Sequence, residues 1–186
     1  MKSPLQPDLV REAPCQDVIL EPPNLTSLPI LKHLPDDGGP YITAGVAVIR
    51  DPEYGRNVSF HRLMVIGERE VVARLVEGRG THTAWSHSDD DLPIAIAIGC
   101  PLQVLLAAAM SPPKGVDELA IANAISPTPL VPCRTLPLEV PAEAEIVIEG
   151  RLTHRLVPEG PFIDLTETWD TVRQQPVLEA DCITHR

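Results

Sequence analysis

The chain has 186 residues, 44% of them hydrophobic, which is enough for one domain with a substantial core. Its formal net charge of −11, with no Lys/Arg-rich run, argues against nucleic acid and anionic membranes as partners. No segment reaches transmembrane length, and residues 1–16 lack the apolar core of a signal peptide. The four cysteines are far apart and form no CxxC pair, which favours free thiols over disulfides or zinc. We therefore expect a cytoplasmic protein.

Twenty-one prolines and only 3% aromatic residues predict short strands and turns around an aliphatic core. Residues 1–27 read as an irregular arm, in which 15–20 could add one short strand. Apolar and β-branched runs then predict strands at 41–50, 57–66, 71–76, 92–100, 130–138 and 145–152, the first two joined as a hairpin by the turn 51–56.

Two short helices are expected between these strands. Residues 102–110 are rich in Ala and Leu, and Pro112-Pro113 ends that helix before a second one at 116–125. From Thr166 onward the periodicity is weak, which suggests a loosely ordered end with a tail at 176–186. The expected fold is a β-rich α+β domain, a barrel with short helices inserted between strands.

Three segments carry candidate chemistry: 158–164, 57–62 and 112–118. The segment 158–164 holds Glu159 and Asp164 on a backbone stiffened by two prolines. The strand 57–62 holds Arg62, which needs carboxylate partners if it is buried. An arginine flanked by these two acids would keep one ionised and leave the other as a proton donor, whereas the structural alternative is an ordinary surface turn beside a solvent-facing arginine.

Oxygen ligands come from the same strand and from the second helix. Asn57 offers an amide oxygen and Glu118 a carboxylate, a pair that suits Mg²⁺ or Mn²⁺ bound to a substrate phosphate. The alternative is a turn asparagine and a carboxylate at a helix start. His82, in the segment 79–85, is either a ligand or a solvated loop residue.

Taken together, seven ordered segments make the chain resemble the central domain of the UbiD-type decarboxylases. The match runs from about Leu28 to Gln175 and includes the segments 35–45, 57–62, 107–110, 115–118, 138–142, 145–150 and 158–162. The resemblance implies a split β-barrel related to flavin reductases. It also implies prenylated FMN as cofactor, supplied by a flavin prenyltransferase, with Mn²⁺ or Mg²⁺ and with K⁺ as a further candidate ion.

By this resemblance, Arg62, Glu159 and Asp164 are the catalytic residues, with Asp164 as the proton donor. Asn57 and Glu118 bind the metal, Gly80 aligns with a third metal ligand of some members, and His82 is a nearby substitute. The cofactor-binding positions are Asn57, Ser59, Phe60, His61, Arg62, Arg79, Ala108, Met110 and Glu118.

The implied function is reversible decarboxylation of an aromatic or α,β-unsaturated carboxylic acid. Family members are longer and oligomeric, so the chain would be a fragment, or one subunit of a split enzyme whose partner chain carries the missing domains. The alternative is a non-catalytic barrel that binds flavin or a partner protein.

Overall fold

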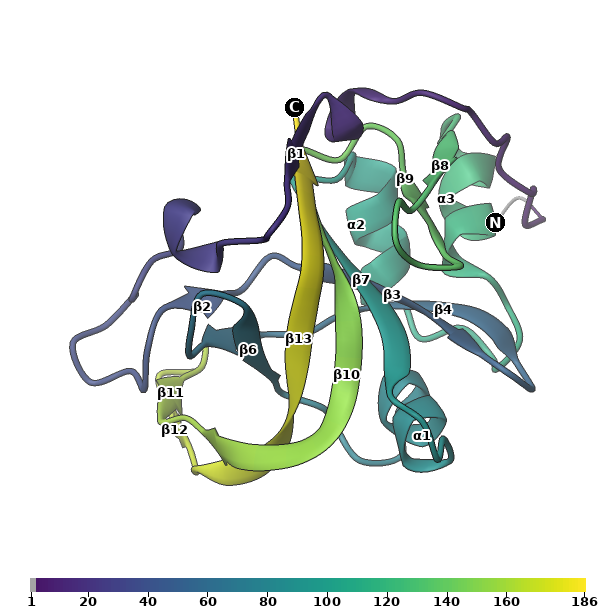
Figure 1. Ribbon diagram of the computed structural model, residues 1–186. Helices are drawn as coiled ribbons and strands as arrows, with labels where there is room; N and C mark the ends of the chain where they lie inside the picture. Colours follow the sequence, from purple (N-terminus) through teal and green to yellow (C-terminus); the bar gives the residue numbers. More distant parts are fainter. Residues whose placement is uncertain (1–2) are drawn as a thin grey trace.

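The computed structural model describes residues 3–186 and consists mainly of one curved antiparallel sheet with helices packed around it (Figure 1). The strands follow the order β2-β5-β6-β13-β10-β7-β3-β4, and β1 pairs with β13. Their bounds are β1 Val18–Leu20, β2 Tyr41–Ile42, β3 Val46–Asp51, β4 Gly55–Phe60, β5 Leu63–Val65, β6 Glu70–Ala73, β7 Leu92–Ile98, β10 Ile146–Glu159 and β13 Arg173–His185.

Smaller elements are attached to this sheet. Two short hairpins pair β8 (Leu130–Pro132) with β9 (Glu139–Pro141), and β11 (Phe162–Ile163) with β12 (Trp169–Asp170). The helices are α1 (Gly80–Ser86), α2 (Leu102–Ala109) and α3 (Glu118–Ile125), with 3-10 turns η1 (Pro14–Gln16) and η2 (Leu25–Ser27). No helix within residues 3–186 is long and apolar enough to cross a membrane.

The central strands are buried on both faces, which explains their unbroken apolar runs. In β7, Ile94 and Ile96 belong to the core inside the curved sheet, whereas Ala95 and Ala97 belong to a second core beneath α2 and α3. Successive strand residues point to opposite faces, so the Ile/Ala alternation separates a bulky side from a thin one. The small alanines allow helix α2 to pack close to the sheet.

Several sequence expectations are confirmed. Strands β3 and β4 form the expected hairpin, with Val48 opposite Val58, and α2 and α3 lie where short helices are expected. The second strand of that hairpin is interrupted after Phe60, so the sheet continues separately as β5. The expected single strand at 130–138 is instead β8, and α1 was missed because GTHTAWS carries no apolar repeat.

The expectation of a loose C-terminal end and tail is wrong. Residues 173–185 form β13, which lies between β6 and β10 in the middle of the sheet (Figure 1). Pro176 in this stretch reads as a strand breaker, and burial on both faces removes the alternation that marks an exposed strand. The residues assigned to a tail are therefore part of the core.

Candidate active site

A cavity of about 570 Å³ lies where β4, the start of α1, the end of α2 and the loop before α3 meet. That volume is in the usual range for small-molecule and cofactor sites. The structure brings all nine expected cofactor-binding residues to its wall: Asn57, Ser59, Phe60, His61, Arg62, Arg79, Ala108, Met110 and Glu118. These residues come from four separate segments, so only the fold could bring them together.

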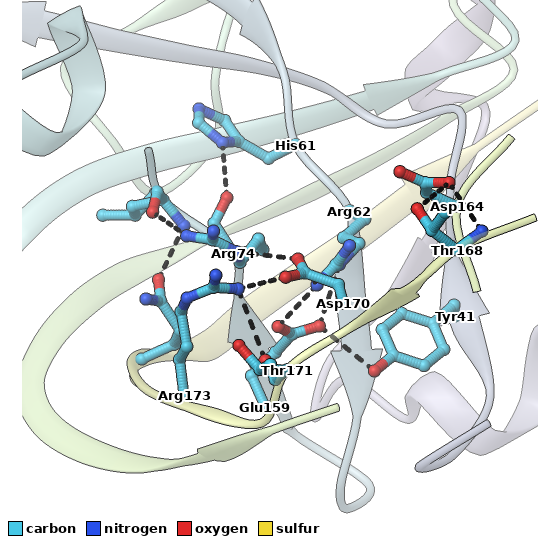
Figure 2. Close-up of polar contacts among 12 residues, drawn as sticks. Tyr41, His61, Arg62, Arg74, Glu159, Asp164, Thr168, Asp170, Thr171 and Arg173 are labelled. Atoms are coloured by element: carbon cyan, nitrogen blue, oxygen red, sulfur yellow. Dashed lines mark hydrogen bonds and ion pairs between the residues drawn. The ribbon is translucent and has the colours of Figure 1, made fainter. Parts of the chain in front are cut away.

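Arg62 lines this wall and forms a buried bidentate ion pair with Glu159, which is not among the residues that line the cavity (Figure 2). Arg62 Nε donates to Glu159 Oε1 and Nη2 to Oε2, each at 2.9 Å, and Glu159 is 0% exposed. Tyr41 adds a third hydrogen bond to Glu159 Oε1 at 3.1 Å. Burial, together with the charge of Glu159, raises the pKa of Tyr41, so its hydroxyl stays a donor at neutral pH.

Asp164 does not join this pair, which corrects the expected contact between Arg62 and two acids. Its carboxylate lies in the turn between β11 and β12 and accepts hydrogen bonds from Thr166 and Thr168. Figure 2 shows the contact with Thr168. Those hydrogen bonds lower the pKa of Asp164 and hold it ionised in this conformation. Threonines two and four residues downstream compete with Arg62 for the carboxylate through local hydrogen bonds. A role for Asp164 as proton donor stays a prediction.

The second acid on Arg62 is Asp170, which sequence reasoning missed. Arg62 Nη2 donates to Asp170 Oδ2 at 2.8 Å. Burial alone would lower the pKa of Arg62, but the hydrogen bonds and charges of Glu159 and Asp170 raise it. No sequence signal marks Asp170, because it lies in the stretch of weak periodicity and reaches Arg62 only through the hairpin.

The proline-rich and glycine-rich segments position this pair. The loop 35–40 docks on the turn after β10, where Gly38 N donates to Pro161 O at 2.7 Å. A Cβ on Gly38 would lie 2.2 Å from Gly160 O, so only glycine allows this approach. The docking places Phe162 4.7 Å from the Tyr41 ring and 4.5 Å from the Arg62 guanidinium. An aromatic ring over the cation adds to the orientation of Arg62.

Asn57 and Glu118 meet at another part of the cavity wall. Val58 N donates to Glu118 Oε2 at 3.0 Å, whereas the contact of Asn57 Nδ2 with Glu118 Oε1 is long, at 3.4 Å. Glu118 is 4% exposed, and this burial raises its pKa to about 7. One oxygen of a buried carboxyl thus has only a weak partner beside an amide group. Such a donor pair fits a hard divalent cation, which would hold the carboxylate ionised.

Gly80 leaves the space that Asn57 needs. A Cβ at Gly80 would lie 2.7 Å from Asn57 Oδ1 and 2.8 Å from Nδ2, so a larger residue would displace the amide. His82 lies in α1, with its ring edge against Trp85 at 5.9 Å, and its Nδ1 accepts a long contact from Gly78 N at 3.5 Å. No cluster of three or more His, Cys, Asp or Glu with ligand geometry occurs within residues 3–186. His82 is not among the residues that line the cavity, and its role as a third ligand stays a prediction.

His61 links the two parts of the wall through a buried hydrogen-bond network. Its Nδ1 lies 3.1 Å from the carbonyl oxygen of Arg74, which requires a proton on Nδ1. Nε2 then accepts from Thr81 Oγ1 at 3.0 Å or Ser59 Oγ at 3.1 Å. Burial lowers the pKa of His61, so the imidazole is neutral and serves as a structural connector.

Basic side chains gather on the cavity wall although the chain as a whole is acidic. They are Arg56, Arg62, Arg74, Arg79 and Lys114. Arg79 contacts Ser111 Oγ at 3.3 Å, and Lys114 lies 5.0 Å from the Tyr54 ring; neither forms an ion pair within residues 3–186. Two uncompensated cations at one cavity attract an anionic group such as a phosphate. Arg74 and Lys114 were not singled out from sequence, and nothing in their local pattern distinguishes them.

Comparison with known proteins agrees with this geometry. The family model described as "UbiD: 3-octaprenyl-4-hydroxybenzoate carboxy-lyase Rift-related domain" matches residues 8–186. The anhydromevalonate phosphate decarboxylase of Methanothermobacter thermautotrophicus is 46% identical over 165 residues, covering 85% of this chain and 38% of its own length. The enzyme of the same name from Methanosarcina mazei is 40% identical over 183 residues, covering 96% and 43%.

Solved structures give the same result. An evolved dimeric form of the UbiD-class enzyme HmfF from Pelotomaculum thermopropionicum, in complex with prFMN, superposes with a TM-score of 0.93 at 40% identity, covering 99% of this chain and 45% of that one. The flavoredoxin of Desulfovibrio vulgaris (Miyazaki F) has a TM-score of 0.57 at 11% identity over 87% of this chain and 75% of its own, and so shows fold likeness alone. These likenesses confirm the expected α+β, flavin-reductase-like fold. The chain belongs to the UbiD family, and it spans less than half the length of the two archaeal decarboxylases and of the HmfF chain.

Proposed function

We propose that the cavity binds prenylated FMN and that the chain provides the cofactor- and acid-binding barrel of a decarboxylase. The observation that carries this proposal is the convergence of an Arg62–Glu159 pair, an Asn57–Glu118 pair and uncompensated cations on one cavity. A non-catalytic barrel would not need a fully buried carboxylate held by three hydrogen bonds at a ligand cavity.

The residues on the wall suit the two ends of such a cofactor. Asn57 and Glu118 would hold Mn²⁺ or Mg²⁺ against the cofactor phosphate, and Arg79 and Lys114 would neutralise its remaining charge. The apolar side chains of Phe60, Ala108 and Met110 would line its ring system. When bound, prenylated FMN supplies an electron sink for the electron pair released with CO₂.

Arg62 would bind the substrate, and Glu159 would exchange a proton with it. Nη1 of Arg62 has no hydrogen-bond partner within residues 3–186, so it remains available for a substrate carboxylate. Glu159 is fully buried and does not line the cavity, so it would act as a general acid or base on the carbon from which CO₂ leaves only after a rearrangement that exposes its carboxyl group. Asp164 would serve as proton donor only after leaving Thr166 and Thr168.

The substrate class follows from the relatives' names and from the charge of the cavity. Two relatives are named for a phosphorylated acid, and the cavity carries more cations than the cofactor phosphate alone requires. We therefore propose a small unsaturated acid, phosphorylated in the manner of anhydromevalonate phosphate. The flavin prenyltransferase would supply the cofactor, and further segments, on this or a partner chain, would close the site in an oligomer.

Binding of FMN and riboflavin compares the phosphate and ring contributions directly. In a fluorescence titration, Mn²⁺ is expected to increase the affinity for FMN by roughly tenfold or more, because the metal would contact the FMN phosphate. Riboflavin has no phosphate and cannot make this contact. Riboflavin affinity should not depend on Mn²⁺. If FMN and riboflavin bind alike under both conditions, the proposed cofactor site is wrong.

A further inference from the structure

Asp170 lies among three arginines at the edge of the cavity. Its Oδ2 accepts from Arg62 Nη2 at 2.8 Å and from Arg74 Nε at 3.5 Å, and its Oδ1 accepts from Arg173 Nη1 (Figure 2). Burial acts to raise its pKa, but the hydrogen bonds from Arg173 and Arg62 prevail and lower it to about 2. Asp170 is therefore ionised at neutral pH.

The hairpin geometry explains why Asp170 rather than Asp164 reaches Arg62. In the β11–β12 ladder, Asp170 is paired with Phe162 at the base of the hairpin, while Asp164 belongs to the turn at its tip. Phe162 stacks on the Arg62 guanidinium, so the same cross-strand pair contacts one cation from two sides. This arrangement fixes the plane of the Arg62 guanidinium against Glu159.

The arginines of this cluster outnumber its carboxylates. Within residues 3–186, the only acidic partners of Arg62, Arg74 and Arg173 are Glu159 and Asp170, which leaves one positive charge uncompensated. Arg62 and Arg74 line the cavity, whereas Arg173 does not. The Asp170 carboxylate lies between Arg62 and Arg74 and orients both side chains. The remaining positive charge can then pair with an anion that enters the cavity.

We propose that Asp170 is a positioning residue that orients Arg62 and Arg74 in the cavity wall for binding the carboxylate of the substrate. The binding role rests on the proposed function, but the orienting role does not. A purely structural alternative exists, because Asp170 also bonds to Arg173 three residues away, which could merely fasten the end of the hairpin. Asp170→Asn and Arg173→Gln separate these possibilities, since only Asp170→Asn removes the charge that faces Arg62.

The first measurement uses the apo protein and needs no cofactor. The rate of rotation about the Nε–Cζ bond of arginine side chains, followed by ¹⁵N NMR, reports how firmly each guanidinium is held. We expect Asp170→Asn to speed rotation at Arg62 roughly tenfold, because a charge-assisted hydrogen bond on Nη2 is lost. Arg173→Gln should leave Arg62 within about twofold of wild type, because Asp170 and Glu159 keep their contacts with it.

An unchanged rotation rate at Arg62 in Asp170→Asn would overturn the proposal, as would an equal acceleration in Arg173→Gln. If Asp170→Asn does not fold, the wild type still offers a result that would overturn the proposal. Rotation at Arg62 must then be much slower than at Arg151, whose side chain is 58% exposed in its ion pair with Asp181. Equal rates at these two arginines would refute firm orientation.

The second measurement titrates the same proteins with benzoate, as a simple carboxylate, and follows the Arg62 Nε signal. Asp170→Asn is expected to weaken benzoate binding roughly tenfold and Arg173→Gln by less than about twofold. Unchanged benzoate binding in Asp170→Asn would overturn the proposal. If wild type binds neither benzoate nor FMN, the proposed function fails, while the rotation rates still decide whether Asp170 orients Arg62.

Discussion

Replacing Arg62 by methionine is expected to destabilise the protein by leaving the Glu159 carboxylate buried with only one donor. Glu159 is 0% exposed and receives two of its three hydrogen bonds from Arg62. Methionine fills most of the volume of the arginine stem, so the loss reflects the missing charge rather than a cavity. The remaining bond, from Tyr41, does not compensate an ionised group.

The magnitude follows from the burial of the pair. Removing one partner of a buried ion pair costs about 3–5 kcal/mol, and the partial exposure of Arg62 places this case near the lower end, at about 3 kcal/mol. In a domain of this length, that loss lowers the melting temperature by roughly 6–12 °C. Adding Glu159→Gln removes the stranded charge, so the double variant should regain about 2 kcal/mol.

Urea unfolding at neutral pH measures these differences in the free energy of unfolding. Arg151→Met is the matched control, because its ion pair with Asp181 is exposed and should contribute less than about 1 kcal/mol. The reasoning is refuted if Arg62→Met and the double variant are equally unstable. Loss of stability in Arg151→Met as large as in Arg62→Met would also contradict it.

Three further predictions concern buried polar groups. Since burial lowers the pKa of His61, the unfolded chain takes up a proton that the folded chain resists, so the free energy of unfolding should fall as pH drops below about 6.5, and less so in His61→Gln. Without metal, the raised pKa of Glu118 makes stability fall as pH rises from about 4.5 towards 7; Glu118→Gln should remove this loss in a pH series, and Mn²⁺ should raise the melting temperature of wild type but not of the variant. Glu149 is fully buried and accepts hydrogen bonds from Arg134 N at 2.9 Å and from Thr135 N and Oγ1, each at 2.7 Å; Glu149→Gln should cost about 1–3 kcal/mol in urea unfolding, and a cost near zero would refute its role in holding this loop.

Local pattern was sufficient for the elements that the chain encodes over short distances. The Ala/Leu composition of 102–110 and the β-branched alternation around 41–60 depend on neighbours in sequence, and both gave the observed helix and hairpin. Local pattern did not identify the strand at 173–185, because its strand character comes from pairing with β6 and β10. Its partners on β6 are about 100 residues away in sequence, and pairing at that distance leaves no mark on a local periodicity.

The site residues also include some that sequence motifs identified and some that they missed. Motif resemblance brought the cavity residues together correctly, since those residues come from separate segments whose order the motifs preserve. It failed at the Arg62 cluster, where Asp164 turned towards Thr166 and Thr168 and Asp170 took its place. Two carboxylates six residues apart on one hairpin are equivalent in sequence, and only the strand register decides which one meets the arginine.

The flavin content of the purified protein tests the central claim most directly. Wild type, Glu118→Gln and Arg79→Gln would be co-expressed with a flavin prenyltransferase in Mn²⁺-containing medium, and the bound flavin would be measured by its absorbance per protein chain. The account predicts substantial flavin in wild type and a clear reduction in both variants. Wild type without flavin, or three proteins with equal flavin, would contradict it.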